Sequence, residues 1–275
     1  MKISLCNEVI AELPFEKQCN VMAKLGYDGV EIAPVTLSDE PHVLPAARRK
    51  EIAKIAKNAG IPITGLHYLM VAPQGLSITA KDPAVRQKTF EVMRGLVQLC
   101  ADLGGNLMIH GSPVQRQLDA GDEADSYKRG IEYFAAAGEA ARAAGVTYLL
   151  EPLAKDHTAF VNSVAEAVKI VREIGNPGLQ TMIDCSAAGR SEAQSVPELI
   201  QQWMPSGTIR HIHLNDANRR GPGDGEMKFA PIVAALRAAN YAGIAAVEPF
   251  IYEPDGPTCA ARAIGYMRGT IEAVG

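Results

Sequence analysis

The sequence lacks the features that mark several large classes of protein. It has no run of 18 or more apolar residues, which a membrane-spanning helix would need. It also has no excess of basic residues, since 27 Lys and Arg stand against 31 Asp and Glu, for a net charge of −4. A protein that binds the phosphate backbone of a nucleic acid needs clustered positive charge. We therefore expect neither a membrane nor a nucleic acid among the partners.

Other absences bear on location and domain organisation. The opening MKISLC has no extended apolar stretch with a small-residue cleavage site, so it predicts a first strand rather than a signal peptide. The five cysteines lack metal-finger spacing, which indicates reduced thiols in a cytoplasmic protein; Cys6 and Cys185 are expected to be small buried residues. No low-complexity segment or linker divides the chain, so residues 1–275 are expected to form one domain.

What the sequence does have is a regular alternation of short strand-like and longer helical segments. The strand candidates are residues 2–6, 29–33, 63–69, 106–111, 147–152, 180–185, 210–215 and 244–249. The clearest helix spans 83–104, where apolar residues recur at spacings of three and four. Further helices are expected at 126–144, 163–174, 195–204, 229–240 and 259–273.

Eight strand–helix units in 275 residues predict an α/β fold, a single (β/α)8 TIM barrel. The alternative is an open doubly wound sheet, but the glycine-rich fingerprint GxGxxG of a dinucleotide site is missing. The longer loops, at about 34–44, 70–82, 112–125 and 216–228, all follow strands. In a barrel they would lie at the C-terminal face, where active sites are built.

Ionisable residues close the last four predicted strands: Glu151, Asp184, His213 and Glu248. Carboxylates that converge at the mouth of a barrel repel one another unless a cation joins them. Hard oxygen ligands with one imidazole suit Mn²⁺, our first choice, and also Co²⁺, Mg²⁺ or Zn²⁺. The sequence therefore predicts one divalent metal ion bound by these four residues.

Two histidines, His211 and His213, lie in the same strand candidate. Because strand side chains alternate, both point to the same face, into the barrel. His213 lies nearer the mouth and is the better ligand. His211 lies one layer deeper, where we expect it to support the site.

These motifs resemble the xylose-isomerase-like barrel superfamily, and in particular its sugar phosphate isomerases/epimerases and ketose 3-epimerases, such as those acting on D-tagatose and D-psicose. The resemblance spans essentially the whole chain, from GYDGVEI at 26–32 onward. Its motifs are Glu151-Pro-Leu, the strand-closing Asp184, His211-Ile-His213 with Arg219 six residues beyond, and Glu248-Pro-Phe.

The resemblance implies that Glu151, Asp184, His213 and Glu248 bind one divalent metal, that Glu151 and Glu248 also act as acid and base, and that Arg219 contacts the substrate. The substrate would be a ketose or related keto-sugar that reacts through an enediolate stabilised by the metal. Carboxylates on opposite faces would epimerise a centre, whereas one face alone would favour aldose–ketose isomerisation.

Two departures from the epimerase pattern leave the substrate open. The glutamate expected six residues after Glu151 is His157, and the histidine expected three residues after Asp184 is Ala187. Further polar residues at or near strand ends provide donors and acceptors for a polyhydroxylated ligand. The predicted substrate contacts are Arg219, His157, His211, His67, His110 and Glu8.

Three alternatives stay open on the residues alone. A lyase or dehydratase acting on a keto-sugar, keto-inositol or 3-keto-glycoside would begin with the same enediolate and use His157 as the acid. An apurinic endonuclease would need a basic face and more histidines than His67 and His110 provide. A binding protein without catalysis would not need both Glu151 and Glu248. We also expect a homo-oligomer, either a dimer or a tetramer.

Overall fold

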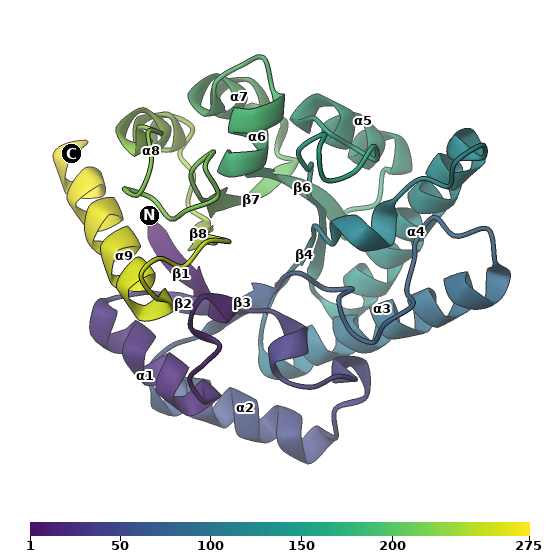
Figure 1. The fold of residues 1–275 in the computed structure, drawn as a ribbon, viewed down its shortest axis with the longest axis horizontal. Coiled ribbons are helices and arrows are strands. Elements are labelled where there is room, and N and C mark those ends of the chain that lie inside the picture. Colours follow the sequence, from purple (N-terminus) through teal and green to yellow (C-terminus); the bar gives the residue numbers. More distant parts are fainter.

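Eight parallel strands form a closed barrel in the computed structural model, which describes residues 1–275. Each strand pairs with the next one in the chain, and β8 pairs with β1. Figure 1 shows the strands at the centre and the helices around them. The predicted TIM barrel and all eight predicted strands are confirmed. The strands are β1 (Lys2–Cys6), β2 (Gly29–Ile32), β3 (Ile63–Leu66), β4 (Leu107–His110), β5 (Thr147–Leu150), β6 (Leu179–Asp184), β7 (Ile209–Leu214) and β8 (Ile244–Val247).

Nine α-helices surround the barrel. The six helices predicted with ranges are all present, with ends within three residues of the expected ones. The other three are α1 and α2, which had no predicted range, and α6, a short helix directly after β6. The helices are α1 (Phe15–Leu25), α2 (Ala46–Asn58), α3 (Pro83–Leu103), α4 (Glu123–Ala144), α5 (Val164–Ile174), α6 (Cys185–Ser191), α7 (Val196–Trp203), α8 (Phe229–Ala238) and α9 (Gly256–Ala273). Short 3-10 helices are η1 (Asn7–Ile10), η2 (Pro34–Thr36), η3 (Pro41–Val43), η4 (Pro113–Arg116) and η5 (Met204–Ser206).

The ends of the helices follow from local sequence signals. The Asp82 side chain accepts a hydrogen bond from the Ala84 N–H at the start of α3, and Pro83 occupies a position that needs no N–H partner. The same helix ends at Gly104, whose φ of 82° is the left-handed conformation that glycine adopts without strain. Asp184 caps α6 in the same way, since its Oδ1 accepts from the Ala187 N–H at 2.6 Å.

The apolar core forms two parts. A cluster of 62 buried residues draws members from the helices and the strands. A separate cluster of Ile109, Leu149 and Met182 comes from three neighbouring strands. Leu149 and Met182 lie two residues before Glu151 and Asp184, so they share the faces of those acids and lie below them in the barrel. All five cysteines are buried free thiols, as expected for Cys6 and Cys185.

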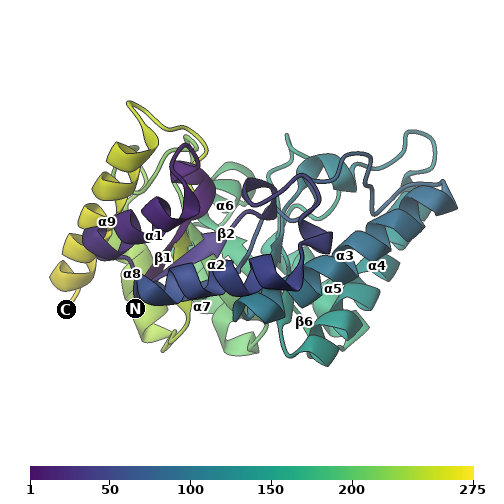
Figure 2. The ribbon, with the colours of Figure 1, turned by 90° about the horizontal axis from the view of Figure 1, so that it is seen from below.

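The barrel places the ends of all eight strands at one face. In the side view of Figure 2, the long loops that follow the strands gather along the upper edge, and the N-terminus lies lower. The register aligns Asp184 with His213, and His213 with Ala246 two residues before Glu248. None of the helices combines the length and the apolar character needed to span a membrane.

Candidate metal centre and active site

The four residues predicted to bind a metal meet at the C-terminal face of the barrel. Glu151 and Glu248 directly follow β5 and β8, Asp184 ends β6, and His213 lies in β7. One potential ligand atom from each lies within 4.8 Å of the others, and all four residues are buried. This is a compact set of three carboxylates and one imidazole, drawn from four different strands.

The orientation of His213 makes this cluster a good fit for a cation. Its Nε2 lies 2.9 Å from Glu31 Oε1 in a hydrogen bond, so Nε2 carries the proton that it donates to the carboxylate. Its Nδ1 lies 2.7 Å from Glu248 Oε2 and 3.4 Å from Glu151 Oε1. Neither Nδ1 nor Glu248 Oε2 has an aligned hydrogen-bond partner, although both are buried. A divalent ion among these acceptor atoms would satisfy them together.

The charges of the cluster shift its pKa values in opposite directions. Burial and the charges of Glu151 and Glu248 raise the pKa of Asp184 to about 7. Although burial opposes ionisation, His213 and His67 lower the pKa of Glu248 to about 2. The surrounding carboxylates, led by Glu248 and Glu31, outweigh burial and raise the pKa of His213 well above its ordinary value. The cluster therefore retains a proton in the absence of a cation, which is the behaviour of a cation site.

Glu31, on β2, links the two histidines of β7. Its Oε2 lies 3.0 Å from His211 Nε2, while its Oε1 accepts from His213. His211 Nδ1 donates to the Ile244 carbonyl oxygen at 2.9 Å. Burial opposes ionisation of Glu31, but His211 and His213 outweigh it and hold the Glu31 pKa well below its usual range. The structure therefore places His213 at the cluster and His211 behind it.

A second histidine bridge supports Glu248 from another side. His67, just after β3, lies with Nδ1 3.0 Å from Glu248 Oε1 and Nε2 2.8 Å from Glu8 Oε2. Burial disfavours its charged form, yet Glu8 and Glu248 raise the pKa of His67 to about 10. His67 is thus a cation at neutral pH, held between two carboxylates.

Asn215 fixes the remaining acid. Its Nδ2 donates to Asp184 Oδ2 at 2.7 Å and to the Glu248 carbonyl oxygen at 3.1 Å, while its Oδ1 accepts from the Ser186 N–H. One amide side chain therefore joins the ends of β6, β7 and β8. Because Asp184 Oδ1 is used by the α6 cap, both of its oxygens are oriented by the protein.

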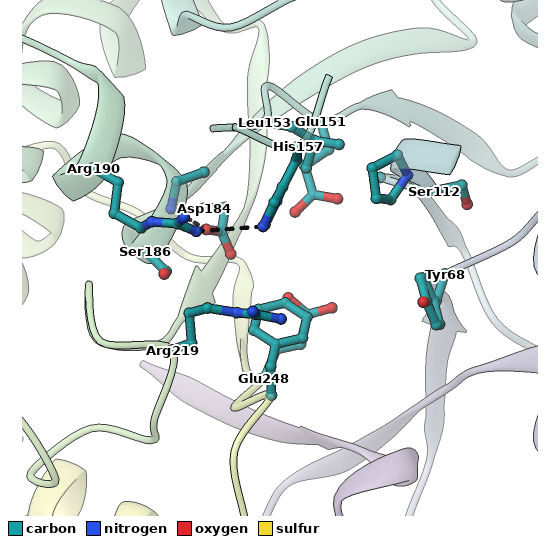
Figure 3. A pocket seen from close by; sticks show the side chains of 14 residues that line it. Tyr68, Ser112, Glu151, Leu153, His157, Asp184, Ser186, Arg190, Arg219 and Glu248 are labelled. Carbon is teal, nitrogen blue, oxygen red and sulfur yellow. Dashed lines mark hydrogen bonds between the residues drawn. The ribbon is translucent and has the colours of Figure 1, made fainter. Parts of the chain in front are cut away.

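A cavity of about 310 Å³ opens directly above the cluster. Figure 3 shows the carboxylates of Glu151, Asp184 and Glu248 directed toward its centre. The lining comes from the loops after strands β3 to β8, which confirms the expected position of the pocket at this face. The lining residues are Tyr68, Gly111, Ser112, Pro113, Glu151, Leu153, His157, Asp184, Ser186, Ala187, Arg190, Arg219, Glu248 and Phe250.

The structure places the predicted substrate contacts in three settings. Arg219 and His157 line the cavity. His67, Glu8 and His211 lie outside the lining. His67 contacts Glu248 and Glu8, and His211 contacts Glu31.

His110 lies apart from the other predicted contacts. It is buried among Tyr133, Phe134 and Tyr148, and its Nδ1 lies 2.7 Å from the Tyr148 hydroxyl. It has no side-chain contact with the cavity.

The sequence-based prediction assigned no role to three residues that stand out here: Asn215, Ser186 and Arg190. It counted Glu31 only among the polar residues near strand ends that could surround a polyhydroxylated ligand. A glutamate inside an apolar strand is a signal that could have identified Glu31, because a buried acid needs partners. Asn215 lies two residues after His213 and so shares its face. Ser186 and Arg190 belong to α6, which the sequence pattern did not reveal.

Comparisons with known proteins agree with this architecture. A family model described as xylose isomerase-like TIM barrel matches residues 19–270. The D-psicose 3-epimerase of Agrobacterium fabrum is 28% identical over 235 residues, which cover 84% of this chain and 77% of that protein. The L-ribulose 3-epimerase of Mesorhizobium japonicum is also 28% identical, over 74% of this chain and 68% of that one.

Solved structures show the same fold. A crystal structure of D-psicose 3-epimerase in the presence of D-fructose aligns with a TM-score of 0.83 at 23% identity, covering 98% of this chain and 99% of that one. The relatives named above are epimerases, and epimerases are isomerases, in agreement with the predicted enzyme class. With a family model matched over most of its length, the chain belongs to the xylose isomerase-like TIM barrel family.

Proposed function

We propose that the protein is a divalent-metal-dependent isomerase or epimerase that acts on a ketose or related keto-sugar. The observation that carries this proposal is the pair Glu151 and Glu248. Both carboxylates face one cavity, beside the same histidine and aspartate. The names of the relatives, D-psicose 3-epimerase and L-ribulose 3-epimerase, support a ketose as the substrate class.

The positions of the two glutamates suit proton transfer at two faces of one carbon. In the closed barrel, β5 and β8 are separated by β6 and β7, so Glu151 and Glu248 enter the cavity from different sides. One carboxylate removes the proton next to the substrate carbonyl, which leaves an enediolate. The other glutamate, protonated at the start, delivers its proton from its own side, and the centre is inverted.

Glu151 and Glu248 have different contacts, which suit them to different roles in this proton transfer. Glu248 Oε1 is fixed by the His67 cation, which favours its ionised form. Glu151 has no side-chain partner of this kind, and its main-chain carbonyl is held by Arg116 Nη1 at 2.8 Å. We assign the base at the start of the reaction to Glu248 and the returning acid to Glu151.

Glu151, Asp184, His213 and Glu248 would hold the metal ion, with Mn²⁺ as our first choice. When bound, a divalent ion polarises the substrate carbonyl and stabilises the negative charge of the enediolate. His213 would bind it through Nδ1, since Nε2 donates to Glu31.

Elimination is the competing reaction, and the setting of His157 weighs against it. Its Nε2 lies 3.4 Å from Arg190 Nη1, and an arginine can only donate, so Nε2 accepts. Burial lowers the His157 pKa; the charge of Asp156 opposes this shift, and those of Arg190 and Arg219 reinforce it. A neutral imidazole is a weak acid for expelling a leaving group.

Solvent isotope exchange tests the proposal. The Mn²⁺-loaded protein is incubated in D₂O with a panel of ketoses and 3-keto-glycosides, and the products are followed by NMR and mass spectrometry. We expect one deuteron at the inverted carbon without loss of water or aglycone. Glu151→Gln and Glu248→Gln should abolish turnover and keep the fold. Release of water or aglycone from the substrate would establish elimination instead.

A further inference from the structure

Two arginines line the part of the cavity next to Asp184. Figure 3 shows Arg190, from α6, and Arg219, from the loop after β7, on one side of the cavity, with Tyr68 and Ser112 on the other. The proposed chemistry at Glu151 and Glu248 uses neither arginine. A neutral sugar would not need two guanidinium groups at one end of its site.

Arg219 has no acidic partner. Its side chain makes no ion pair and no hydrogen bond in the structure, and the guanidinium carbon lies 5.3 Å from the centre of the Phe250 ring. Its backbone adopts a φ of 69°, which is unfavourable for a residue with a side chain. Three main-chain hydrogen bonds maintain this conformation: Arg219 N–H donates to the Asp216 carbonyl oxygen, and Phe250 N–H and Ile251 N–H both donate to the Arg219 carbonyl oxygen. The fold thus holds an exposed guanidinium without an acidic partner at the cavity.

Arg190 is only partly neutralised. It pairs with Asp156, whose side chain is 59% exposed and does not line the cavity. Its other terminal nitrogen donates toward His157 Nε2, which leaves the proton of His157 on Nδ1. The arginine and the imidazole both retain donors, and neither presents a negative charge to the cavity.

Ser186 provides an independent sign of a missing acceptor. The residue is 2% exposed and lines the cavity, yet its Oγ has no hydrogen-bond partner. Its main-chain N–H is held by Asn215 Oδ1 at 2.8 Å, so its position is fixed. A buried hydroxyl of this kind is normally satisfied, and here a ligand oxygen would do so.

We propose that the substrate carries an oxyanion group, a carboxylate or a phosphate, which Arg190, Arg219 and Ser186 bind. This inference rests on the proposed function and specifies the substrate class: an anionic keto-sugar, with its carbonyl end at Glu151 and Glu248. Guanidinium groups bind oxyanions through paired, charge-assisted hydrogen bonds. A neutral hydroxyl in place of the oxyanion would lose the attraction between opposite charges.

Three probes that differ only at carbon 6 test this inference: D-fructose, D-fructose 6-phosphate and D-fructuronate. Turnover by the Mn²⁺-loaded protein is measured by deuterium incorporation, and binding is measured by calorimetry. We expect one anionic probe to exceed D-fructose in kcat/KM by about ten- to a hundred-fold, the effect of a charge-assisted contact. The favoured probe identifies the anion as carboxylate or phosphate. Its advantage should shrink as salt is raised.

Variants connect this preference to the residues. Arg219→Gln and Arg190→Gln should each reduce the ratio of anionic to neutral kcat/KM by about ten-fold or more, and Ser186→Ala should reduce it less. Arg142→Gln is the matched control, because Arg142 lies on α4 with an exposed partner, Glu139. It should leave the ratio unchanged.

The outcomes separate the two proposals. If D-fructose is converted as well as both anionic probes, the inference is overturned and the proposed function stands. If an anionic probe binds in an arginine-dependent way, but neither the probes nor the panel of ketoses and 3-keto-glycosides are converted, the anion site stands and the epimerase proposal fails. If the anionic probes neither react nor bind, or if their advantage survives both arginine substitutions, the inference is overturned.

Discussion

Glu31 Oε1 accepts a hydrogen bond from His213 Nε2 at 2.9 Å, so Nδ1 is the nitrogen of His213 that faces the three carboxylates. This contact fixes the Nε2 proton and the ring orientation of His213, the one imidazole among the four candidate ligands. Substituting a carboxylate that orients a ligating histidine in this way usually weakens metal binding by roughly 10- to 100-fold.

Glu31→Gln should therefore weaken Mn²⁺ binding by about 10- to 100-fold, because an amide oxygen accepts less strongly and its NH₂ group can be turned toward a histidine. Calorimetric titration of the metal-free protein measures this loss. Glu51→Gln, an exposed change on α2, serves as the control. Unaltered affinity in the Glu31 variant would show that His213 does not bind the metal through Nδ1.

The two histidines of β7 should respond differently to substitution. His213→Ala removes the nitrogen that faces Glu151 and Glu248, and we expect it to abolish metal binding and activity. His211→Ala removes a side chain that contacts Glu31 and the Ile244 carbonyl, so it should weaken the site and leave it recognisable. Metal content after dialysis distinguishes the two. The reverse order of effects would contradict the assigned positions.

The barrel and its four clustered candidate ligands could be predicted from the sequence, because both depend on short-range sequence patterns. Strand alternation and strand-end acids define the faces and ends of elements, and the closed topology then brings Glu151, Asp184, His213 and Glu248 together. The contacts that orient these residues could not be predicted in this way. Glu31 reaches His213 across 182 positions of the chain, and no local pattern encodes such a pair.

The cavity wall shows the same limit. Helix α6 begins directly at the end of β6 and has only seven residues, too few for a clear helical period. Its Arg190 and Ser186 were therefore not recognised as lining residues. His110 shows the converse case, since a polar residue at a strand end lies instead among aromatic rings.

His67 is expected to act through Glu248 and Glu8 as one unit. His67→Gln removes the cation between the two carboxylates, and we expect kcat to fall by about ten-fold or more, with less effect on KM. Glu8→Gln should reduce kcat less. Glu8, His67 and Glu248 form one chain of contacts. The loss of kcat in the double variant should therefore be smaller than the sum of the losses in the two single variants. Additive losses would mean that Glu8 does not act through His67.

The stability of the protein should decrease below about pH 6.5, and His110 should account for part of the decrease. Burial and the charge of Arg116 lower the His110 pKa well below its usual value of about 6.5. The unfolded chain therefore takes up a proton that the folded protein does not, and stability is lost as the pH falls.

His110→Phe removes this titration and keeps a ring within the aromatic cluster. The Tyr148 hydroxyl retains a partner in Tyr133, 3.0 Å away. Urea unfolding at pH 7.5 and pH 5.5 should show that the parent loses about 1 kcal/mol more than the variant over this interval. Equal losses would indicate that His110 is protonated in the folded state.

Arg116 should be essential to the stability of the fold beside the candidate metal centre. The residue is fully buried, and its two terminal nitrogens donate to five carbonyl oxygens with no acid among its hydrogen-bond partners. The acceptors are the main-chain oxygens of His110, Gly111, Glu151, Phe160 and Val161. Burial lowers the Arg116 pKa to about 10, so the side chain stays cationic at neutral pH.

Arg116→Lys keeps the charge but loses the planar fork that reaches both groups of carbonyls. We expect it to reduce the free energy of unfolding by about 3 kcal/mol or more, since several buried acceptors lose their donors. Denaturant titration measures the change, and Arg142→Lys on the surface of α4 should stay within about 0.5 kcal/mol of the parent. If Arg116→Lys is as stable as Arg142→Lys, those carbonyls have other donors, and the position of Glu151 does not depend on Arg116.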